Sequence, residues 1–119
     1  MMLGQLVKVV MDRPLGSLHP NHQFFYPINY GYLPGTVAGD GEEVDAYVIG
    51  EFEPLEEFEG YVVAIIYRED DIERKLVVCR ERNRYTKEQI EVLVEFQERF
   101  FKSHVVMEED EEIGGDLSS

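Results

Sequence analysis

Apolar and polar positions along this chain predict a series of short strands over its first two thirds. The apolar runs are bounded by Gly, Pro, Asp and Asn, which commonly end strands. The segment interrupted by Pro27 and Gly31 should be a bent strand. The run at 61–67 is apolar throughout, which is typical of a strand buried on both faces. The expected strands are 6–11, 24–32, 44–49, 61–67 and 74–79.

The period of the pattern changes after residue 85. Thr86 and Gln89 have the spacing of a capping box, which marks the start of a helix. Apolar residues then recur at near-helical spacing, so we expect one amphipathic helix over 87–103, followed by a short strand at 105–107. Several short strands and one late helix predict an α+β fold that is mainly β. The expected architecture is a small closed barrel with the helix packed on it.

Length and charge limit the classes of function. With 119 residues, 44% of them hydrophobic, the chain should form a single domain, which we place at 1–107. The segment 108–119 has six acidic residues and no Lys or Arg, so we expect an acidic, disordered tail. The net charge of −14 argues against nucleic acid or an anionic membrane as a partner, because phosphate-rich surfaces bind basic faces.

The ends and the single cysteine suggest a compartment. The N-terminal residues lack the pattern of a signal peptide, and no apolar run approaches the ~18 residues of a membrane span. We therefore expect a cytoplasmic protein. Cys79 is the single cysteine and lies in an apolar run, which favours a buried thiol over a disulfide or a zinc ligand.

Carboxylates are concentrated in the turn before the strand at 44–49. Asp40, Glu42 and Asp45 lie within six positions, beside Gly39 and Gly41. Oxygen donors of this kind suit magnesium, manganese or calcium better than zinc. A solvated acidic turn is the alternative interpretation.

A second acidic turn follows the strand at 61–67. It contains Glu69, Asp70, Asp71 and Glu73. A solvated turn is again the alternative, but two acidic turns at the ends of apolar strands can converge on one rim of a small barrel. Two such clusters facing one cleft could hold two divalent ions, an arrangement used for in-line attack on phosphorus.

Cationic and aromatic side chains complete the candidate chemistry. Lys8 has apolar neighbours, and if it points inward it should face anions; an outward position in the alternating pattern is the alternative. Lys75 opens a strand and Lys102 lies near the expected end of the helix. The hydroxyls of Tyr26 and Tyr30 could donate to phosphate oxygens or simply pack at the surface. The loop histidines, His19 and His22, are expected to be solvated.

Two of these segments occur together in a known family. Tyr-Pro-Ile-Asn-Tyr-Gly-Tyr at 26–32, followed by Asp-Gly-Glu-Glu-Val-Asp-Ala at 40–46, resembles the soluble family I inorganic pyrophosphatases in order and spacing. The resemblance implies a five-stranded OB-like barrel with a C-terminal helix. It also implies hydrolysis of inorganic pyrophosphate to two orthophosphates, with Mg²⁺ as cofactor and Mn²⁺ as the alternative.

The resemblance also assigns roles by position. It implies catalytic roles for Glu42, where the family has the aspartate that helps activate water, and for Asp45. Secondary candidates are Tyr26, Arg13 and Asp71. The metal ligands it implies are Asp40, Glu42, Asp45, Asp70 and Glu73, and the substrate-binding residues it implies are Lys8, Tyr30, Lys75 and Lys102.

The chain departs from the family pattern at several positions. Glu42 adds a methylene to the expected aspartate, Val10 replaces a glutamate and Leu18 replaces an arginine. Arg13, Asn21 or His22 could substitute for that arginine. Phe101 lacks a tyrosine hydroxyl. Two alternatives therefore stay open: the same fold acting on another small phosphoester or diphosphate, and a non-catalytic metal-binding or interaction module. A homo-oligomer is also expected, because small barrels with exposed aromatics often associate.

Overall fold

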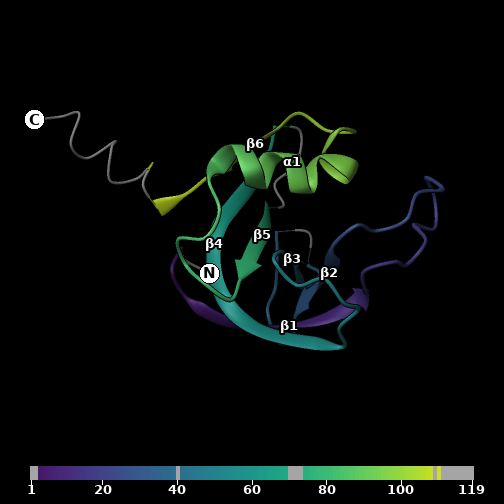
Figure 1. Cartoon of the computed structure of the whole chain (residues 1–119), viewed down its shortest axis with the longest axis horizontal. Helices are drawn as coiled ribbons and strands as arrows, with labels where there is room; N and C mark the ends of the chain where they lie inside the picture. Colours follow the sequence, from purple (N-terminus) through teal and green to yellow (C-terminus); the bar gives the residue numbers. More distant parts are fainter. Residues whose placement is uncertain (1–2, 40, 70–73, 109, 111–119) are drawn as a thin grey trace, which may run out of the picture.

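The computed structural model describes residues 3–39, 41–69, 74–108 and 110. Five strands close into a barrel and one helix lies against its outside (Figure 1). The strands follow one another around the barrel in the order β1, β2, β3, β5, β4, and β4 returns to β1. The elements are β1 (Leu6–Arg13), β2 (Asn29–Leu33), β3 (Val44–Val48), β4 (Glu57–Arg68), β5 (Arg74–Cys79), α1 (Lys87–Glu98) and β6 (Ser103–Val106). The five-stranded barrel with one helix is therefore confirmed.

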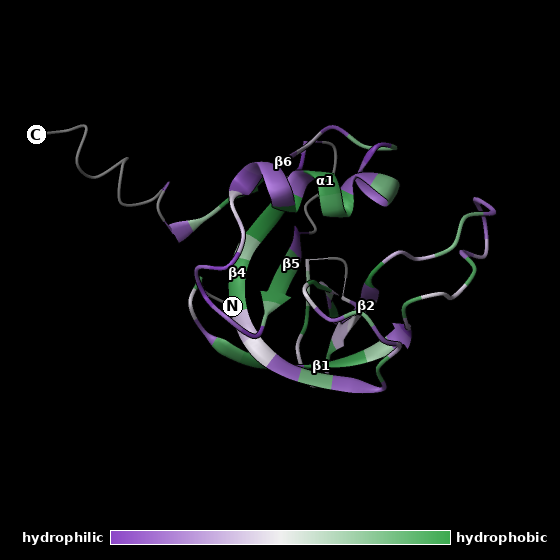
Figure 2. Ribbon diagram, viewed as in Figure 1, coloured by the Kyte–Doolittle hydropathy of each residue, from purple (hydrophilic) through white to green (hydrophobic). Residues whose placement is uncertain are grey.

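The long strand β4 joins the barrel to the C-terminal part of the chain. Its first half pairs with β1, from Glu57 to Tyr61, and its second half pairs with β6, from Ile65 to Arg68. Both partners are antiparallel, whereas β3 and β5 run parallel. Figure 2 shows the alternation of hydrophilic and hydrophobic residues in the half of β4 beside β1 and the hydrophobic half beneath α1. The short last strand predicted at 105–107 is confirmed as β6.

Alternate residues of the strands belong to two separate hydrophobic clusters. The barrel interior contains Val9, Ala46, Val48, Leu76 and Val78, each with no exposed surface. The second cluster lies on the outer face, between the strands and the helix. It includes Tyr47, Ile49, Val77, Ile90 and Val94. The sheet is therefore buried on both faces where α1 covers it, and Cys79 is buried in the outer cluster as predicted.

Several boundaries differ from the expected ones. β2 begins at Asn29, because Pro27 cannot donate a ladder hydrogen bond and only an isolated bridge, Leu18 to Phe25, forms earlier. α1 ends at Glu98 rather than near residue 103, because the chain turns there and then pairs with β4. The Lys102 carbonyl, just before β6, accepts from the Glu69 amide, just after β4. The predicted capping box of Thr86 and Gln89 is present.

Within the described residues, no helix has the length and apolarity needed to cross a membrane. Most of the predicted acidic tail, from residue 111 onward, lies outside those residues, so the division at 107 and 108 stays a prediction.

Candidate active site

A cleft of about 390 Å³ opens on the outer face of the barrel, beyond the part that the helix covers. Its walls come from four places: the strands, the loop 14–28, the last turn of α1 and the segment that follows α1. The charged lining residues are Asp12, Arg13, Asp45, Arg68 and Lys75. Three cations thus face two carboxylates in a chain whose net charge is −14. Among the described residues, the lining of the cleft therefore carries more cations than carboxylates.

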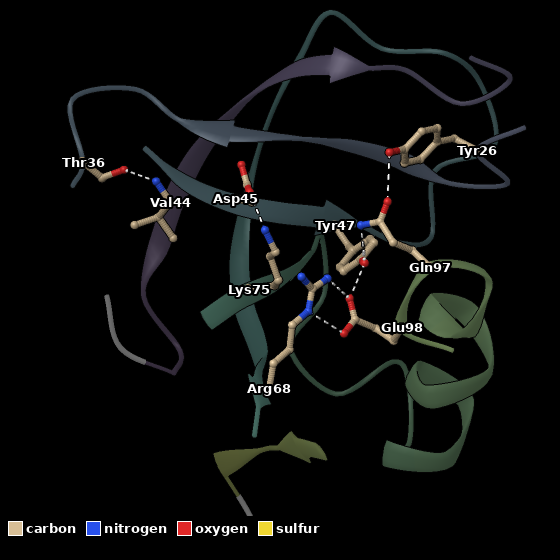
Figure 3. Close-up of polar contacts among 9 residues, drawn as sticks. All are labelled: Tyr26, Thr36, Val44, Asp45, Tyr47, Arg68, Lys75, Gln97 and Glu98. Atoms are coloured by element: carbon tan, nitrogen blue, oxygen red, sulfur yellow. Dashed lines mark hydrogen bonds and ion pairs between the residues drawn. The ribbon is translucent and has the colours of Figure 1, made fainter. Parts of the chain in front are cut away.

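Asp45 and Lys75 form the floor of the cleft. Asp45 lies on β3 between Val44 and Ala46, which point into the barrel, so its own side chain points outward. The Lys75 ammonium lies 2.5 Å from Asp45 Oδ2, and the side chain of Lys75 is 7% exposed. Two neighbouring strands of the sheet therefore contribute an ion pair between a nearly buried lysine and a partly exposed carboxylate (Figure 3).

Tyr30 lies beside this pair. Its ring centroid is 6.0 Å from the Lys75 ammonium, within reach of a cation–π interaction. Burial raises the pKa of the Tyr30 hydroxyl well above its ordinary value, and the charge of Asp45 and a hydrogen bond to it add to the rise. The hydroxyl is thus kept protonated and can act as a donor.

A bulge in β1 brings two further charges to the cleft. The register between β1 and β2 shifts between Met11 and Arg13, and such bulges redirect side chains near functional sites. Arg13 lines the cleft and also interacts with the Tyr26 hydroxyl. Partial burial raises the pKa of Asp12; the Arg13 charge opposes the rise, and the Asp45 charge adds to it. The two carboxylates are therefore close enough to repel each other.

A buried ion pair ties the end of α1 to the same cleft. Arg68, at the end of β4, donates from Nε to Glu98 Oε1 at 3.1 Å and from Nη2 to Glu98 Oε2 at 2.6 Å. Both side chains are almost fully buried. Burial opposes the charged form of Arg68, but the hydrogen bonds and charge of Glu98 raise its pKa above the ordinary value.

Hydrogen bonds extend from this pair across the interface between helix and barrel. The Tyr47 hydroxyl donates to Glu98 Oε2 at 2.6 Å and accepts from Gln97 Nε2 at 2.8 Å. The Tyr26 hydroxyl donates to Gln97 Oε1 at 2.9 Å. Figure 3 shows this chain of contacts running from Arg68 to Tyr26.

The loop 14–28 closes one side of the cleft through aromatic stacking. The His22 ring lies 4.3 Å from that of Phe100, and His19 lies 4.7 Å from Phe24. The Nδ1 atom of His19 accepts from the amides of Asn21 and His22. Burial lowers the pKa of His19, and the charges of His22 and Arg13 add to the decrease. The expectation of solvated histidines holds for His22, which is exposed although its ring stacks on Phe100, and is wrong for His19, which is half-buried.

The structure brings together some of the predicted site residues and separates others. Arg13, Tyr26, Tyr30, Asp45 and Lys75 line the cleft. The remaining predicted residues in the described part of the chain, Lys8, Glu42 and Lys102, are exposed and do not line it. Asp40, Asp70, Asp71 and Glu73 lie outside the described residues.

For Lys8, the structure decides between the two orientations that the sequence left open. Its side chain does not point into the barrel, because Val7 and Val9 take the inward positions of β1. It is 56% exposed and lies 3.3 Å from Glu57 on β4. Its position follows from the two-residue period of the strand.

Some residues of the cleft, and the Glu98 carboxylate that pairs with one of them, were not singled out as site residues from the sequence. Arg68 ends an apolar strand, and Gln97 and Glu98 share the buried face of α1 with Ile90 and Val94. Polar residues on an otherwise apolar helix face are the signal that could have found them, because buried polar groups need partners. Asp12 offered no comparable signal, since its position depends on the bulge.

The described residues that line the cleft include oxygen donors for a hard cation. Asp12 and Asp45 both line the cleft, and a divalent ion between them would relieve their repulsion. Within residues 3–39, 41–69, 74–108 and 110, however, no three His, Cys, Asp or Glu side chains form a complete metal site. The donor chemistry fits magnesium or manganese, and further ligands would have to come from the acidic turns.

Comparison with known proteins places the chain in a family. The family model described as "Inorganic pyrophosphatase" matches residues 4–112. An inorganic pyrophosphatase of Caulobacter vibrioides is 39% identical over 51 residues, which cover 40% of this chain and 29% of that protein. One from Helicobacter pylori is 29% identical over 79 residues, covering 60% of this chain and 46% of that protein. The matched region thus spans less than half the length of these relatives.

The fold agrees with that of a solved inorganic pyrophosphatase structure. The crystal structure of inorganic pyrophosphatase from Ehrlichia chaffeensis superimposes with a TM-score of 0.69 at 15% identity, covering 90% of this chain and 88% of that one. At such low identity the likeness concerns the fold, and the family model carries the assignment. The chain belongs to the inorganic pyrophosphatase family.

Proposed function

We propose that this protein hydrolyses inorganic pyrophosphate to two orthophosphates and uses Mg²⁺ as its cofactor. The observation that supports this most directly is the pair of Asp45 and Lys75 in the cleft, 2.5 Å apart, in a member of this family. One partner can hold a cation and the other a phosphate oxygen. A diphosphate and its counter-ion need both kinds of group side by side.

The cations of the cleft would bind and orient the substrate. Phosphoryl transfer depends mostly on positioning and on neutralising charge, so fixed donors are what the reaction requires. Lys75 is nearly buried, which limits the number of orientations of its ammonium. Arg13 faces the cleft from β1, and the protonated Tyr30 hydroxyl is a neutral donor beside Lys75. Together these groups would hold the oxygens of the leaving phosphate.

The carboxylates would hold the metal. Asp45 and Asp12 supply oxygen donors from the cleft, and the family motif supports Asp40, Glu42, Asp70 and Glu73 as further ligands, with Asp71 as an alternative. When bound, Mg²⁺ supplies positive charge to the diphosphate and lowers the pKa of a water molecule. Mn²⁺ has similar ligand preferences and is the alternative ion.

Glu42 is proposed on the motif as the group that accepts a proton from the attacking water. It lies in an exposed turn, two residues before β3, so its reach to the cleft depends on that turn. Lys8 and Lys102 are not included in the substrate set, since both side chains are exposed and lie off the lining of the cleft as the described residues form it.

Assembly and location are part of the same proposal. We infer a homo-oligomer, supported by the exposed rings of Phe25 and Phe52, which are 67% and 75% accessible. Large exposed apolar side chains are often interface residues. A cytoplasmic location is inferred from the sequence alone.

The test is phosphate release from pyrophosphate in the presence of Mg²⁺, with two matched variants. Asp45→Asn and Glu57→Gln each convert a carboxylate that pairs with a lysine into an amide, but Asp45 lines the cleft and Glu57 pairs with Lys8 on the barrel exterior. We expect Asp45→Asn to lower kcat/KM by about a hundredfold or more, as for loss of a positioned electrostatic group, and Glu57→Gln to change it little.

Two outcomes would contradict the proposal. One is a wild-type rate at background level; the other is an equal rate for Asp45→Asn and Glu57→Gln. A panel of small phosphoesters in the same assay separates pyrophosphate hydrolysis from action on another substrate. A thermal shift with Mg²⁺ but no turnover on any of them would favour a metal-binding module, because a ligand that binds the native state raises its stability.

A further inference from the structure

Arg68 is held in one orientation by an unusually complete set of contacts. Its Nε and Nη2 atoms occupy both oxygens of Glu98, in the parallel two-bond geometry that suits arginine and a carboxylate. The Phe101 ring covers the guanidinium at 3.7 Å from its centroid. The side chain is 7% exposed. Few rotamers of so long a side chain satisfy these contacts together.

This arrangement leaves one edge of the guanidinium for the cleft. Within the part of the chain that the structure describes, Nη1 makes no hydrogen bond, and Arg68 lines the cleft. Figure 3 shows that nitrogen turned away from Glu98, on the side of Lys75. An arginine in this position can donate to a phosphate oxygen while Glu98 holds its opposite edge.

The carboxylate partner does not cancel this charge inside the cleft. Glu98 accepts from Arg68 and from the Tyr47 hydroxyl, and Tyr47 in turn accepts from Gln97. Glu98 is buried at the helix interface and is not among the described residues that line the cleft. An anion in the cleft therefore meets the guanidinium first and the carboxylate behind it.

A purely structural role explains the pair poorly. A buried ion pair adds little stability compared with apolar side chains of similar volume, because both charges lose their hydration. The protein has a second pair of the same type, Arg80 with Glu51, at 2.9 and 3.2 Å. There the Arg80 side chain is 63% exposed and lies off the cleft. The buried pair is the one that borders the site.

We propose that Arg68 is a substrate-binding residue that donates from Nη1 to a phosphate group of the diphosphate, and that Glu98 and Tyr47 are the positioning residues that hold it. This proposal rests on the proposed function and deepens it. With Arg68 at the end of β4 and Lys75 on β5, cationic side chains of two neighbouring strands would bind the substrate.

The experiment compares Arg68→Lys with the matched variant Arg80→Lys. Lysine keeps the charge but loses the two-bond geometry, so the ammonium cannot bind Glu98 and present a second fixed donor to the cleft. We expect kcat/KM for pyrophosphate to fall about ten- to hundredfold in Arg68→Lys, as for loss of a hydrogen bond to a charged group, mostly through KM. Arg80→Lys should stay within about twofold of wild type, as usual for an exposed pair.

A binding measurement gives a readout that does not depend on turnover. Calorimetric titration with methylenediphosphonate, a diphosphate analogue that resists hydrolysis, should show affinity lowered by a similar factor in Arg68→Lys and unchanged in Arg80→Lys. If Arg68→Lys does not fold, as judged by circular dichroism, Tyr47→Phe replaces it, since loss of a contact to Glu98 should raise KM without removing any charge.

The outcomes separate this inference from the proposed function. If wild type hydrolyses pyrophosphate but the Arg68 and Arg80 variants share its KM and its affinity for the analogue, the role of Arg68 is overturned and the function stands. If wild type binds the analogue without hydrolysing pyrophosphate, the function fails, and the affinity of Arg68→Lys alone decides the role of Arg68. If wild type neither hydrolyses nor binds, both are overturned.

Discussion

The two faces of the same strands have different chemistry and different tasks. On β3, Val44 and Ala46 point into the barrel, whereas Asp45 and Tyr47 point outward. On β5, Leu76 is fully buried inside, whereas Lys75 faces the cleft. Because successive side chains of a strand point to opposite faces, one short segment can supply both core and site. The interior holds the barrel together, and the exterior provides the candidate chemistry.

The outer face is itself divided by the helix. Where α1 covers the strands, the residues are apolar and pack against Ile90 and Val94. Beyond the helix the face is polar and opens as the cleft. The boundary is the hydrogen-bonded chain through Tyr47 and Glu98, which is buried but polar.

The strongest way to separate the two faces is to damage the interior alone. Leu76→Ala should lower the free energy of unfolding by about 2–5 kcal/mol, because it removes buried methyl groups and leaves a cavity. KM for pyrophosphate in the folded fraction should change much less than the stability, because the Leu76 side chain points to the opposite face of β5 from that of Lys75. Urea denaturation and steady-state kinetics measure the two quantities.

Leu76→Met is the control for this variant. A volume-conserving exchange should cost less than about 1.5 kcal/mol. If Leu76→Ala changed KM as much as stability, the interior and the cleft would not be separable, and the comparison would fail.

The second test acts on the boundary. Tyr47→Phe removes the hydroxyl that donates to Glu98 and accepts from Gln97, and should cost about 1–3 kcal/mol of stability, because buried polar atoms lose a partner. Unlike Leu76→Ala, it should also raise KM several-fold, since Glu98 positions Arg68. Thermal unfolding and kinetics on the same preparation check both effects.

The matched control is Tyr67→Phe. Tyr67 lies on β4, half-buried, with its ring stacked on His104. The Tyr67→Phe variant should have the KM of wild type. If both variants had the same KM as wild type, the boundary would be only structural.

Local patterns were enough to predict part of this arrangement. Strand alternation, the capping box and the single late helix gave the barrel and its helix. Lys75 and Asp45 could be found because each lies in or beside a dense polar segment of the sequence. Such features depend on neighbours in the chain, so they can be predicted without knowledge of the fold.

Features that depend on pairing between distant residues could not be predicted. Arg68 and Glu98 are 30 positions apart, and their contact depends on where α1 ends. The orientation of Lys8 required the phase of β1 relative to the barrel, which alternation alone leaves open. The need for glycine at position 31 also depends on strand pairing. A Cβ there would lie 2.0 Å from the Val10 carbonyl oxygen, so Gly31 permits close packing of β1 on β2.

The smallest expected effect concerns the far end of the polar boundary, where the Tyr26 hydroxyl donates to Gln97. Burial raises the pKa of Tyr26 to about 12, from an ordinary value of 10.0. The folded state thus favours the protonated phenol, and this contribution to stability is fully present below about pH 10 and lost as the pH rises through about 12. Tyr26→Phe should cost about 1 kcal/mol at neutral pH, the usual value of one hydrogen bond.

The difference between wild type and Tyr26→Phe should therefore shrink across this alkaline interval, because ionisation removes the same donor that the substitution removes. Urea denaturation of both proteins on either side of the interval measures it. A difference that stayed constant would mean that the Tyr26 hydroxyl does not stabilise the fold as a donor. The boundary would then end at Tyr47, and the loop that carries Tyr26 would be held to the helix by the aromatic contact with Phe96 instead.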